Sequence, residues 1–377
     1  MELSVPLLAL LTFAMGGVVS FAASPAVRRF AHIIGAIDVP RDGRRIHKTP
    51  VPRLGGLAIF AGTLAAILVF YEVSRPVRGI LLGSVIVVVL GVIDDVVRLK
   101  AWIKLIVQIV AALVPVFHGV VVEFLSNPIF FSDASYIDLG ALSWPLTVLW
   151  IVAITNSVNL IDGLDGLAVG VSAISSLTLL VIALLLAQPE VAVIMAALAG
   201  ACVGFMPYNI NPAKMFMGDT GATFLGYVLA CVSILGLFKF YTIISFAVPF
   251  LILGLPIFDT VMAVVRRLSS GQSPIAPDRS HVHHRLIDMG FSQKQSVAIL
   301  YTLSAILGLA AVLLTTSGEL KAMYFLLAVI VAVLVGARLF RMNRKGVPPA
   351  APSEDDRAAG GGASSAASPP PPPNSKT

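Results

Sequence analysis

Charged side chains are scarce in this sequence. They make up 12% of the 377 residues, whereas hydrophobic residues make up 57% and the mean hydropathy is +0.93. A chain of this length cannot hide so much apolar surface in a water-soluble core, which excludes an ordinary soluble protein. Its apolar stretches approach the roughly 20 residues that span a bilayer as a helix, and they lack the alternation of a membrane barrel. We therefore expect an all-α, polytopic transmembrane helical bundle.

Cysteine is also scarce, and the common nucleotide-binding loops do not occur. The two cysteines, Cys202 and Cys231, fall in apolar stretches without CxxC spacing, which excludes a disulfide framework or a cysteine zinc site. No G-x-x-x-x-G-K-[ST] loop or dinucleotide fingerprint occurs, so any nucleotide must bind without those devices. The net charge of +6 is typical of cytoplasmic loops and lipid headgroup contacts in a membrane protein, and no nucleic-acid partner is expected.

No basic residue precedes the first apolar run, and Arg28 and Arg29 follow it. This disfavours a cleavable signal peptide and predicts an outside N-terminus. The inside loops then carry seven, three, one and five Lys or Arg residues, against four in the outside loops, so the basic residues favour this orientation. The eleven predicted membrane segments lie near 5–23, 54–71, 79–93, 104–122, 145–161, 167–186, 190–207, 221–237, 242–264, 296–315 and 322–340.

The predicted membrane domain is 1–340, and the C-terminus is expected in the cytoplasm. Residues 341–377 are rich in Pro, Ala, Gly and Ser and end near a run of five prolines. This composition predicts a disordered cytoplasmic tail that takes no part in chemistry.

The first polar motif is the pair Asp94-Asp95 at the end of an apolar segment, followed by Arg98, Lys100 and Lys104. Adjacent carboxylates repel each other unless a cation lies between them. A solvated helix end, balanced by these basic residues, is one interpretation. A site that handles a divalent metal or a phosphate is the other.

The second motif repeats a carboxamide or carboxylate every three residues, at Asn156, Asn159, Asp162 and Asp165. In an ideal helix each such step slips by about 60°, so the first and last side chains would lie on opposite sides. The glycines that follow predict that the helix ends near Asp162, which lets Asp165 turn back into the same pocket. Capping and turn chemistry accounts for one or two of the four; two asparagines in an apolar helix favour function.

The third motif places Asp219 directly before an apolar helix, with Asn209 upstream on the same predicted face. Asp219 is either an ordinary N-cap or a metal ligand, because magnesium is usually held by single oxygens from several elements plus substrate phosphates. The fourth motif, Asp278 to Arg285, contains three histidines and two arginines. Its donors suit a pyrophosphate or sugar phosphate, with zinc binding and a purely structural loop as alternatives.

In this order and spacing, the four motifs resemble the polyprenyl-phosphate N-acetylhexosamine-1-phosphate transferase family (glycosyltransferase 4 family) over about residues 30–310. The resemblance implies transfer of GlcNAc-1-phosphate from UDP-GlcNAc to undecaprenyl phosphate, with release of UMP, at the cytoplasmic face of a bacterial inner membrane. Such a step starts an envelope polysaccharide such as O-antigen, lipopolysaccharide or teichoic acid. Val282 interrupts the run of three histidines typical of the peptidoglycan translocase, which favours UDP-GlcNAc and leaves other UDP-N-acetylaminosugars open.

The motifs and the resemblance together give the candidate site residues. Asn159 and Asp219 match the magnesium ligands of the family, with Mn²⁺ as an alternative ion. The resemblance implies that Lys104 meets the nucleotide diphosphate, Asp165 reads uracil and Lys48 lies near the lipid phosphate. The candidate catalytic acids are Asp94, Asp95 and Asp162, and the candidate substrate-binding residues are Lys48, Lys104, Asn156, Asp165, Asn209, Arg279, His281, His283 and His284.

Three alternatives stay open at this point. The lipid phosphate either attacks the donor directly, which we favour, or the reaction passes through an aspartyl-phosphate intermediate. A secondary transporter also carries Asp and Asn in broken membrane helices, although near the midplane rather than at segment ends. A scaffold that recruits partners through its Pro-rich tail is the third, and a homodimer is compatible with each of them.

Overall fold

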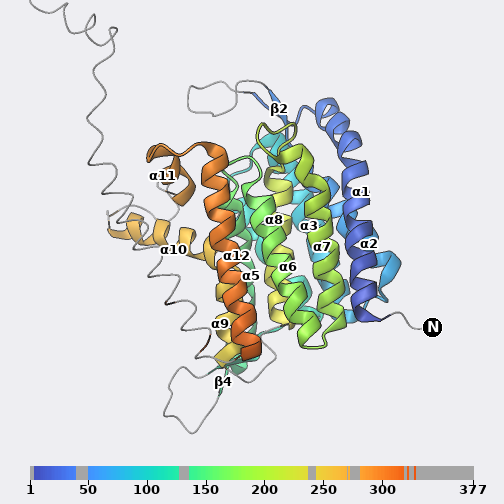
Figure 1. Cartoon of the computed structure of the whole chain (residues 1–377), viewed down its shortest axis with the longest axis vertical. Coiled ribbons are helices and arrows are strands. Elements are labelled where there is room, and N and C mark those ends of the chain that lie inside the picture. Colours follow the sequence, from blue (N-terminus) through green and yellow to red (C-terminus); the bar gives the residue numbers. More distant parts are fainter. Residues whose placement is uncertain are drawn as a thin grey trace, which may run out of the picture. The chain divides into compact units, whose positions relative to one another are not determined.

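The computed structural model describes residues 4–39, 50–126, 136–236, 243–269, 271, 281–317, 321 and 327. These residues form helices joined by short loops, together with two small antiparallel ladders that pair β1 with β2 and β3 with β4 (Figure 1). The helices are α1 (Val5–Ile33), α2 (Gly55–Phe70), α3 (Arg75–Val97), α4 (Ala101–Phe117), α5 (Ser143–Ile161), α6 (Leu167–Leu185), α7 (Pro189–Asn209), α8 (Gly218–Gly236), α9 (Ile243–Ile252), α10 (Gly254–Ser269), α11 (Val282–Asp288) and α12 (Gln293–Ser317). The strands are β1 (Ile37–Asp38), β2 (Val51–Pro52), β3 (Phe124–Ser126) and β4 (Tyr136–Asp138), and a 3-10 turn, η1, covers Gly140–Leu142.

Most predicted membrane segments coincide with one of these helices. Among the described residues, seven helices are long and apolar enough to cross a membrane, and α2 and α4 are shorter apolar helices. A polytopic helical membrane protein is therefore confirmed. The predicted segment 322–340 and the tail after it fall almost wholly outside the described residues, so the number eleven stays a prediction.

The predicted segment 242–264 is wrong as a single membrane helix. Helix α9 ends at Ile252, and α10 begins at Gly254 and runs across the bundle rather than along it (Figure 1). Pro256 has no N–H to donate to the carbonyl of Ile252, and the hydroxyl of Ser175 on α6 donates to that carbonyl instead, at 3.0 Å. The hydrophobic run continues through the break, which is why composition alone predicted one segment.

Helix α8 lies at the centre of the bundle, packed against α3 on one side and α5 on the other. Every residue of α8 is buried except Asp219, in its first turn. Neighbouring glycines allow this close packing: a Cβ on Gly91 of α3 would lie 2.4 Å from the Cα of Thr220, and one on Gly56 of α2 would lie 2.1 Å from the amide nitrogen of Gly221. The fold therefore presents one acidic side chain at the end of its most buried helix.

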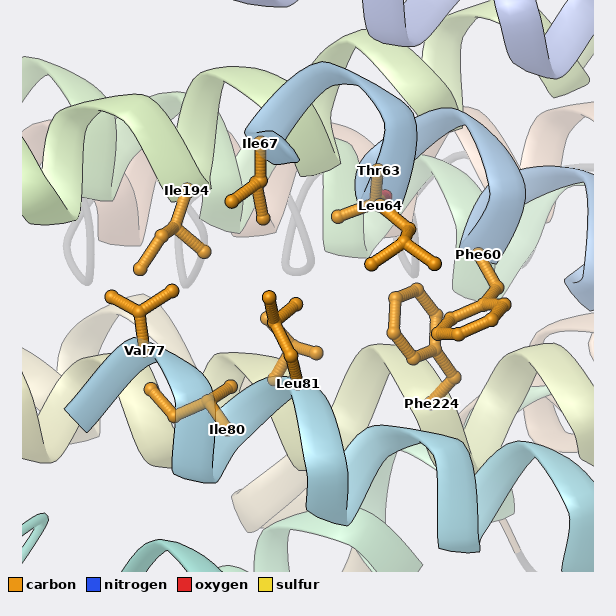
Figure 2. Close-up of a pocket in the computed structure, with 10 residues that line it drawn as sticks. Phe60, Thr63, Leu64, Ile67, Val77, Ile80, Leu81, Ile194 and Phe224 are labelled. Atoms are coloured by element: carbon orange, nitrogen blue, oxygen red, sulfur yellow. The ribbon is translucent and has the colours of Figure 1, made fainter. Parts of the chain in front are cut away.

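The interior between α2, α3, α7 and α8 is apolar and nearly filled. Figure 2 shows the side chains around the small cavity that remains there, of about 10 Å³. Its only polar lining residue is Thr63, whose hydroxyl donates to the carbonyl of Ile59, so the cavity is expected to be dry. This cavity is too small for a substrate, whereas the polar motifs lie at the ends of the helices. The labelled lining residues include Phe60, Ile67, Val77, Ile80, Ile194 and Phe224.

Candidate active site

Lys104 connects the first and third motifs. Helix α3 ends at Val97, the chain turns through Arg98 in the left-handed region (φ 56°), and α4 begins at Ala101. One turn into α4, the Nζ of Lys104 lies 2.7 Å from Oδ2 of Asp94 and 2.8 Å from Oδ2 of Asp219. Asp94 also accepts the backbone N–H of Leu99 at 2.6 Å, which fixes the turn. Three charged groups from α3, α4 and α8 thus meet at one end of the bundle.

Asp95 points away from Asp94 and holds the start of α8. Its Oδ1 accepts the backbone N–H of Asp219 at 3.0 Å, and its Oδ2 accepts the backbone N–H and the hydroxyl of Thr220. Gly218, at φ 73°, leaves no room for a side chain, because a Cβ there would lie 2.4 Å from Oδ2 of Asp95. Asp95 therefore provides the capping group for α8 from another helix, and it fixes the position of Asp219.

The second motif lies where α5 ends. The helix stops at Ile161, so the predicted helix end near Asp162 is confirmed. Asn156 is engaged by Gln108 of α4: its Nδ2 donates to Oε1 of Gln108 at 2.7 Å and to the carbonyl of Val152 at 2.8 Å. Asn159 is partly buried, less than one turn before the end of the helix. The two amides thus differ: Asn156 is hydrogen-bonded between α4 and α5, whereas Asn159 lies at the end of α5.

Asp165 and Asn209 connect the loop after α5 to the loop after α7. Oδ2 of Asp165 accepts the side-chain N–H of Asn211 and the backbone N–H of Ala213, at 2.9 and 3.0 Å. Asn209 is buried, accepts the backbone N–H of Gly166 and donates to the carbonyl of Met215. Both predicted substrate-binding residues are therefore held by contacts within the protein, and their roles toward a substrate stay predictions.

The histidine motif is held by a buried carboxylate on α10. Nδ1 of His281 lies 2.8 Å from Oδ2 of Asp259, and the backbone N–H of Val282 donates to Oδ1 at 2.9 Å. The rings of His281 and His283 are stacked with centroids 5.8 Å apart, and the ring of His284 lies 4.3 Å from that of His283. Asp259 appears in the sequence only as a polar residue in an apolar stretch, yet it orients the start of α11.

The second and fourth motifs also touch each other. A Cβ on Gly163 would lie 2.2 Å from Nε2 of His283, so the ring packs directly on the glycine turn after Asp162. Burial lowers the pKa of His283 to about 4, with a further lowering by His284, so the ring is neutral near pH 7. The four motifs are thus linked through direct contacts or shared electrostatics, whereas Lys48 and Arg279 lie outside the described residues.

The donor set suits a hard divalent cation. Desolvation and the nearby carboxylate of Asp219 raise the pKa of Asp162 to about 7, and Asp95 and Asp165 act in the same direction. Crowded carboxylates of this kind are relieved by a bound cation. In the described part of the chain no three acidic, histidine or cysteine side chains converge on one point.

The helical bundle and the polar groups at one end of it are those of an integral membrane protein with a site for anionic ligands. Residues 77–237 match the model of glycosyl transferase family 4. A probable undecaprenyl-phosphate N-acetylglucosaminyl 1-phosphate transferase of Bacillus subtilis (strain 168) is 43% identical over 296 residues, which cover 78% of this chain and 81% of that protein. The chain therefore belongs to glycosyl transferase family 4.

Two further relatives carry related names. The decaprenyl-phosphate N-acetylglucosaminephosphotransferase of Mycobacterium tuberculosis (strain ATCC 25618 / H37Rv) is 35% identical over 315 residues, covering 75% of this chain and 77% of that protein. The undecaprenyl-phosphate alpha-N-acetylglucosaminyl 1-phosphate transferase of Escherichia coli (strain K12) is 27% identical over 291 residues, covering 76% and 78%. All three names describe transfer to a polyprenyl phosphate.

Proposed function

We propose that this protein transfers GlcNAc-1-phosphate from UDP-GlcNAc to undecaprenyl phosphate and releases UMP. The observation that carries the proposal is the bridge from Lys104 to Asp94 and Asp219, at the end of the bundle where the glycine turn and the histidine motif also meet. The names of the relatives support the same reaction. Its product, a polyprenyl-diphosphate-linked GlcNAc, is the starting unit of an envelope polysaccharide.

In the proposed reaction an oxygen of the lipid phosphate attacks the β-phosphorus of UDP-GlcNAc in line, and the bond from that phosphorus to the UMP oxygen breaks. The attacking phosphate is already ionised near pH 7, so Asp94 has to position it or take a residual proton rather than act as a strong base. Lys104 is placed to exchange its carboxylate partners for phosphate oxygens and to balance the charge that gathers on them. We prefer this direct attack to an aspartyl-phosphate intermediate.

We also propose that the reaction depends on Mg²⁺, with Mn²⁺ as a substitute. Asn159 and Asp219 would hold the ion, and the pKa of Asp162, which is raised by burial and then by the nearby carboxylate of Asp219, supports a cation there. When bound, the ion supplies charge neutralisation at the phosphate oxygens. Asp95 serves this site indirectly, since it fixes the first turn of α8 and with it the carboxylate of Asp219.

An open apolar cavity of about 330 Å³ supports a lipid substrate. It lies between α5, α9 and α10, and it reaches Ser157, which neighbours Asn156 on α5. A polyprenyl chain requires an apolar path that leads to the phosphate site and opens to the bilayer, and the apolar lining of this cavity supports it as part of that path. The residues that line it include Val122, Leu149, Trp150, Ala153, Phe250 and Val261.

The topology that we propose has eleven membrane segments, with α9 and α10 together in place of one continuous ninth helix, an outside N-terminus and the site on the cytoplasmic face of the bacterial inner membrane. The excess of Lys and Arg in the loops on that side supports it. The same face is where a nucleotide sugar made in the cytoplasm is available. The interrupted motif His281-Val282-His283-His284 supports UDP-GlcNAc as the donor.

The experiment measures UMP release by the purified protein from UDP-GlcNAc plus undecaprenyl phosphate, with the lipid product weighed by mass spectrometry. Asp219→Ala and Asp94→Asn are expected to fold and to lose turnover, whereas Asp288→Asn, at an exposed position in α11, keeps it. Turnover that survives in either of the first two variants overturns the role of that residue. Ion-dependent exchange of labelled UMP into UDP-GlcNAc separates the transferase from a transporter, which cannot catalyse it.

A further inference from the structure

The segment that enters α2 is joined to the segment that enters α8. The backbone N–H of Phe216 donates to the carbonyl of Pro52 at 2.8 Å, and the N–H groups of Gly55 and Gly56 donate to the carbonyls of Phe216 and Met217 at 2.9 Å. On its other side the segment is tied to the turn that follows α1, because the N–H of Arg53 donates to the carbonyl of Ala36. Arg53 is therefore held by its backbone beside the segment that leads into α8, whose first turn contains Asp219.

The Arg53 side chain forms an ion pair with Asp95 but makes no hydrogen bond to it. Its Nε lies 3.8 Å from Oδ1 of Asp95, beyond hydrogen-bond distance, and this buried nitrogen has no hydrogen-bond partner within the described ranges. The oxygens of Asp95 already accept three donors from Asp219 and Thr220. Buried polar groups are normally paired, so an unpaired guanidinium nitrogen at an active site requires an explanation.

Lys104 provides the contrast. Its ammonium group has two carboxylate oxygens within 2.8 Å, so its charge is already balanced inside the protein. Arg53 also acts electrostatically on Asp162, which places its charge on the same group of acids. Its side chain is 29% exposed, which leaves it accessible from the open end of the bundle. The site thus contains a partly exposed guanidinium group whose buried Nε has no hydrogen-bond partner among the described residues.

We propose that the guanidinium of Arg53 binds a phosphate oxygen of a substrate, either the polyprenyl phosphate or the diphosphate of the UDP-sugar. A planar guanidinium makes paired, charge-assisted hydrogen bonds to phosphate oxygens that an ammonium group cannot reproduce. The inference rests on the proposed function, since both substrates of that reaction bring phosphate to this end of the bundle. It adds to the site a residue that none of the four polar motifs contains.

The test compares Arg53→Gln and Arg53→Lys with the wild-type protein. A matched control is Arg29→Gln, which removes an exposed arginine near the C-terminal end of α1. We expect Arg53→Gln to lower kcat/KM for one substrate roughly 10- to 100-fold, the effect of losing a charge-assisted hydrogen bond, at an unchanged unfolding temperature. Arg53→Lys is expected to recover part of the loss because it keeps the charge. The substrate whose kcat/KM falls more identifies which phosphate Arg53 binds.

Two results would overturn the inference. In the first, Arg53→Gln keeps kcat/KM for both substrates within about twofold of the wild-type value, a change too small for the loss of a charge-assisted hydrogen bond. In the second, activity falls together with the unfolding temperature and equally in the Gln and Lys variants, which is the behaviour of a structural residue. Wild-type protein and Arg29→Gln that release no UMP overturn the proposed function itself, and this inference with it.

Discussion

Thr220 donates both its backbone N–H and its hydroxyl to Oδ2 of Asp95, at 3.1 and 2.7 Å. Asp95 belongs to α3 and Thr220 to α8, so the contact joins two membrane helices at the point where the carboxylate of Asp219 emerges. The adjacent Asp94 takes a different partner, Lys104. Asp95 thus holds α8 in position, whereas Asp94 contacts a cationic side chain of the site.

Asp95→Asn is expected to lower the free energy of unfolding by about 1–3 kcal/mol, because the amide puts a donor where an oxygen accepts hydrogen bonds. Turnover should fall as well, since the first turn of α8 loses its cap. The measurements are the unfolding temperature in detergent and the rate of UMP release. Thr220→Val should lose stability by about 1 kcal/mol and Thr220→Ser little. An Asp95→Asn protein with wild-type stability and no turnover would instead make Asp95 a reacting group.

The pair Asp94-Asp95 shows what could be predicted from the sequence and what could not. Its position at a helix end followed from the hydrophobic run, and α3 does end at Val97. In the structure Asp94 pairs with Lys104, whereas Asp95 accepts hydrogen bonds from Asp219 and Thr220. Successive helix side chains point about 100° apart, so each carboxylate finds its own partner. Those partners lie on α4 and α8, and no local pattern reveals them.

Gln108 and Asp259 illustrate the same limit. Gln108 follows Lys104 by one helical turn and therefore shares its face of α4, which was a usable signal. Its partner, however, is Asn156, 48 residues away. Asp259 is paired with His281, which follows 22 residues later in the sequence. The break between α9 and α10 was hidden for a related reason, since Ser175 replaces the hydrogen bond that Pro256 removes.

A double-mutant cycle on Gln108 and Asn156 tests whether these residues act as one unit. Both hydrogens of the Asn156 amide are used, toward Gln108 and Val152, so neither is left for a substrate. We expect Gln108→Ala, Asn156→Ala and the double variant to lower kcat/KM for UDP-GlcNAc by similar factors, with a coupling energy of about 0.5–3 kcal/mol. Losses that multiply in the double variant would show that Asn156 contacts the substrate independently of Gln108.

Asp259→Asn tests the orientation of the histidine motif. The carboxylate holds the His281 ring through Nδ1, and we predict that Nε2 of this ring serves a substrate. We expect kcat/KM to fall about tenfold or more, as on loss of a hydrogen bond to a charged group. His281→Gln should have an effect at least as large, and the double variant should be no worse than His281→Gln. If the loss of kcat/KM in the double variant equals the product of the two single losses, Asp259 and His281 act independently.

A bulky side chain in the apolar cavity should block the lipid and spare the nucleotide sugar. Ala153→Trp fills part of the space of about 330 Å³ beside α5. We expect the KM for undecaprenyl phosphate to rise and the KM for UDP-GlcNAc to stay the same. Val110→Trp, on the exposed face of α4, is the control for a bulky residue toward the bilayer. Equal effects of the two variants on both substrates would rule out this cavity as the path of the polyprenyl chain.

His283 should make the stability of the protein depend on acid pH. Burial lowers its pKa from 6.5 to about 4 in the folded protein, so between these values the unfolded chain binds more protons than the native one. Its contribution is therefore complete above pH 6.5 and is lost as the pH falls toward 4, by on the order of 3 kcal/mol in total. Unfolding temperatures of the purified protein at pH 7.5 and 5 measure this loss. His283→Gln should reduce the pH dependence of the unfolding temperature. His118→Gln should not, because of these two residues only His283 is packed on the Gly163 turn. If His283→Gln leaves the pH dependence unchanged, other groups cause the acid sensitivity.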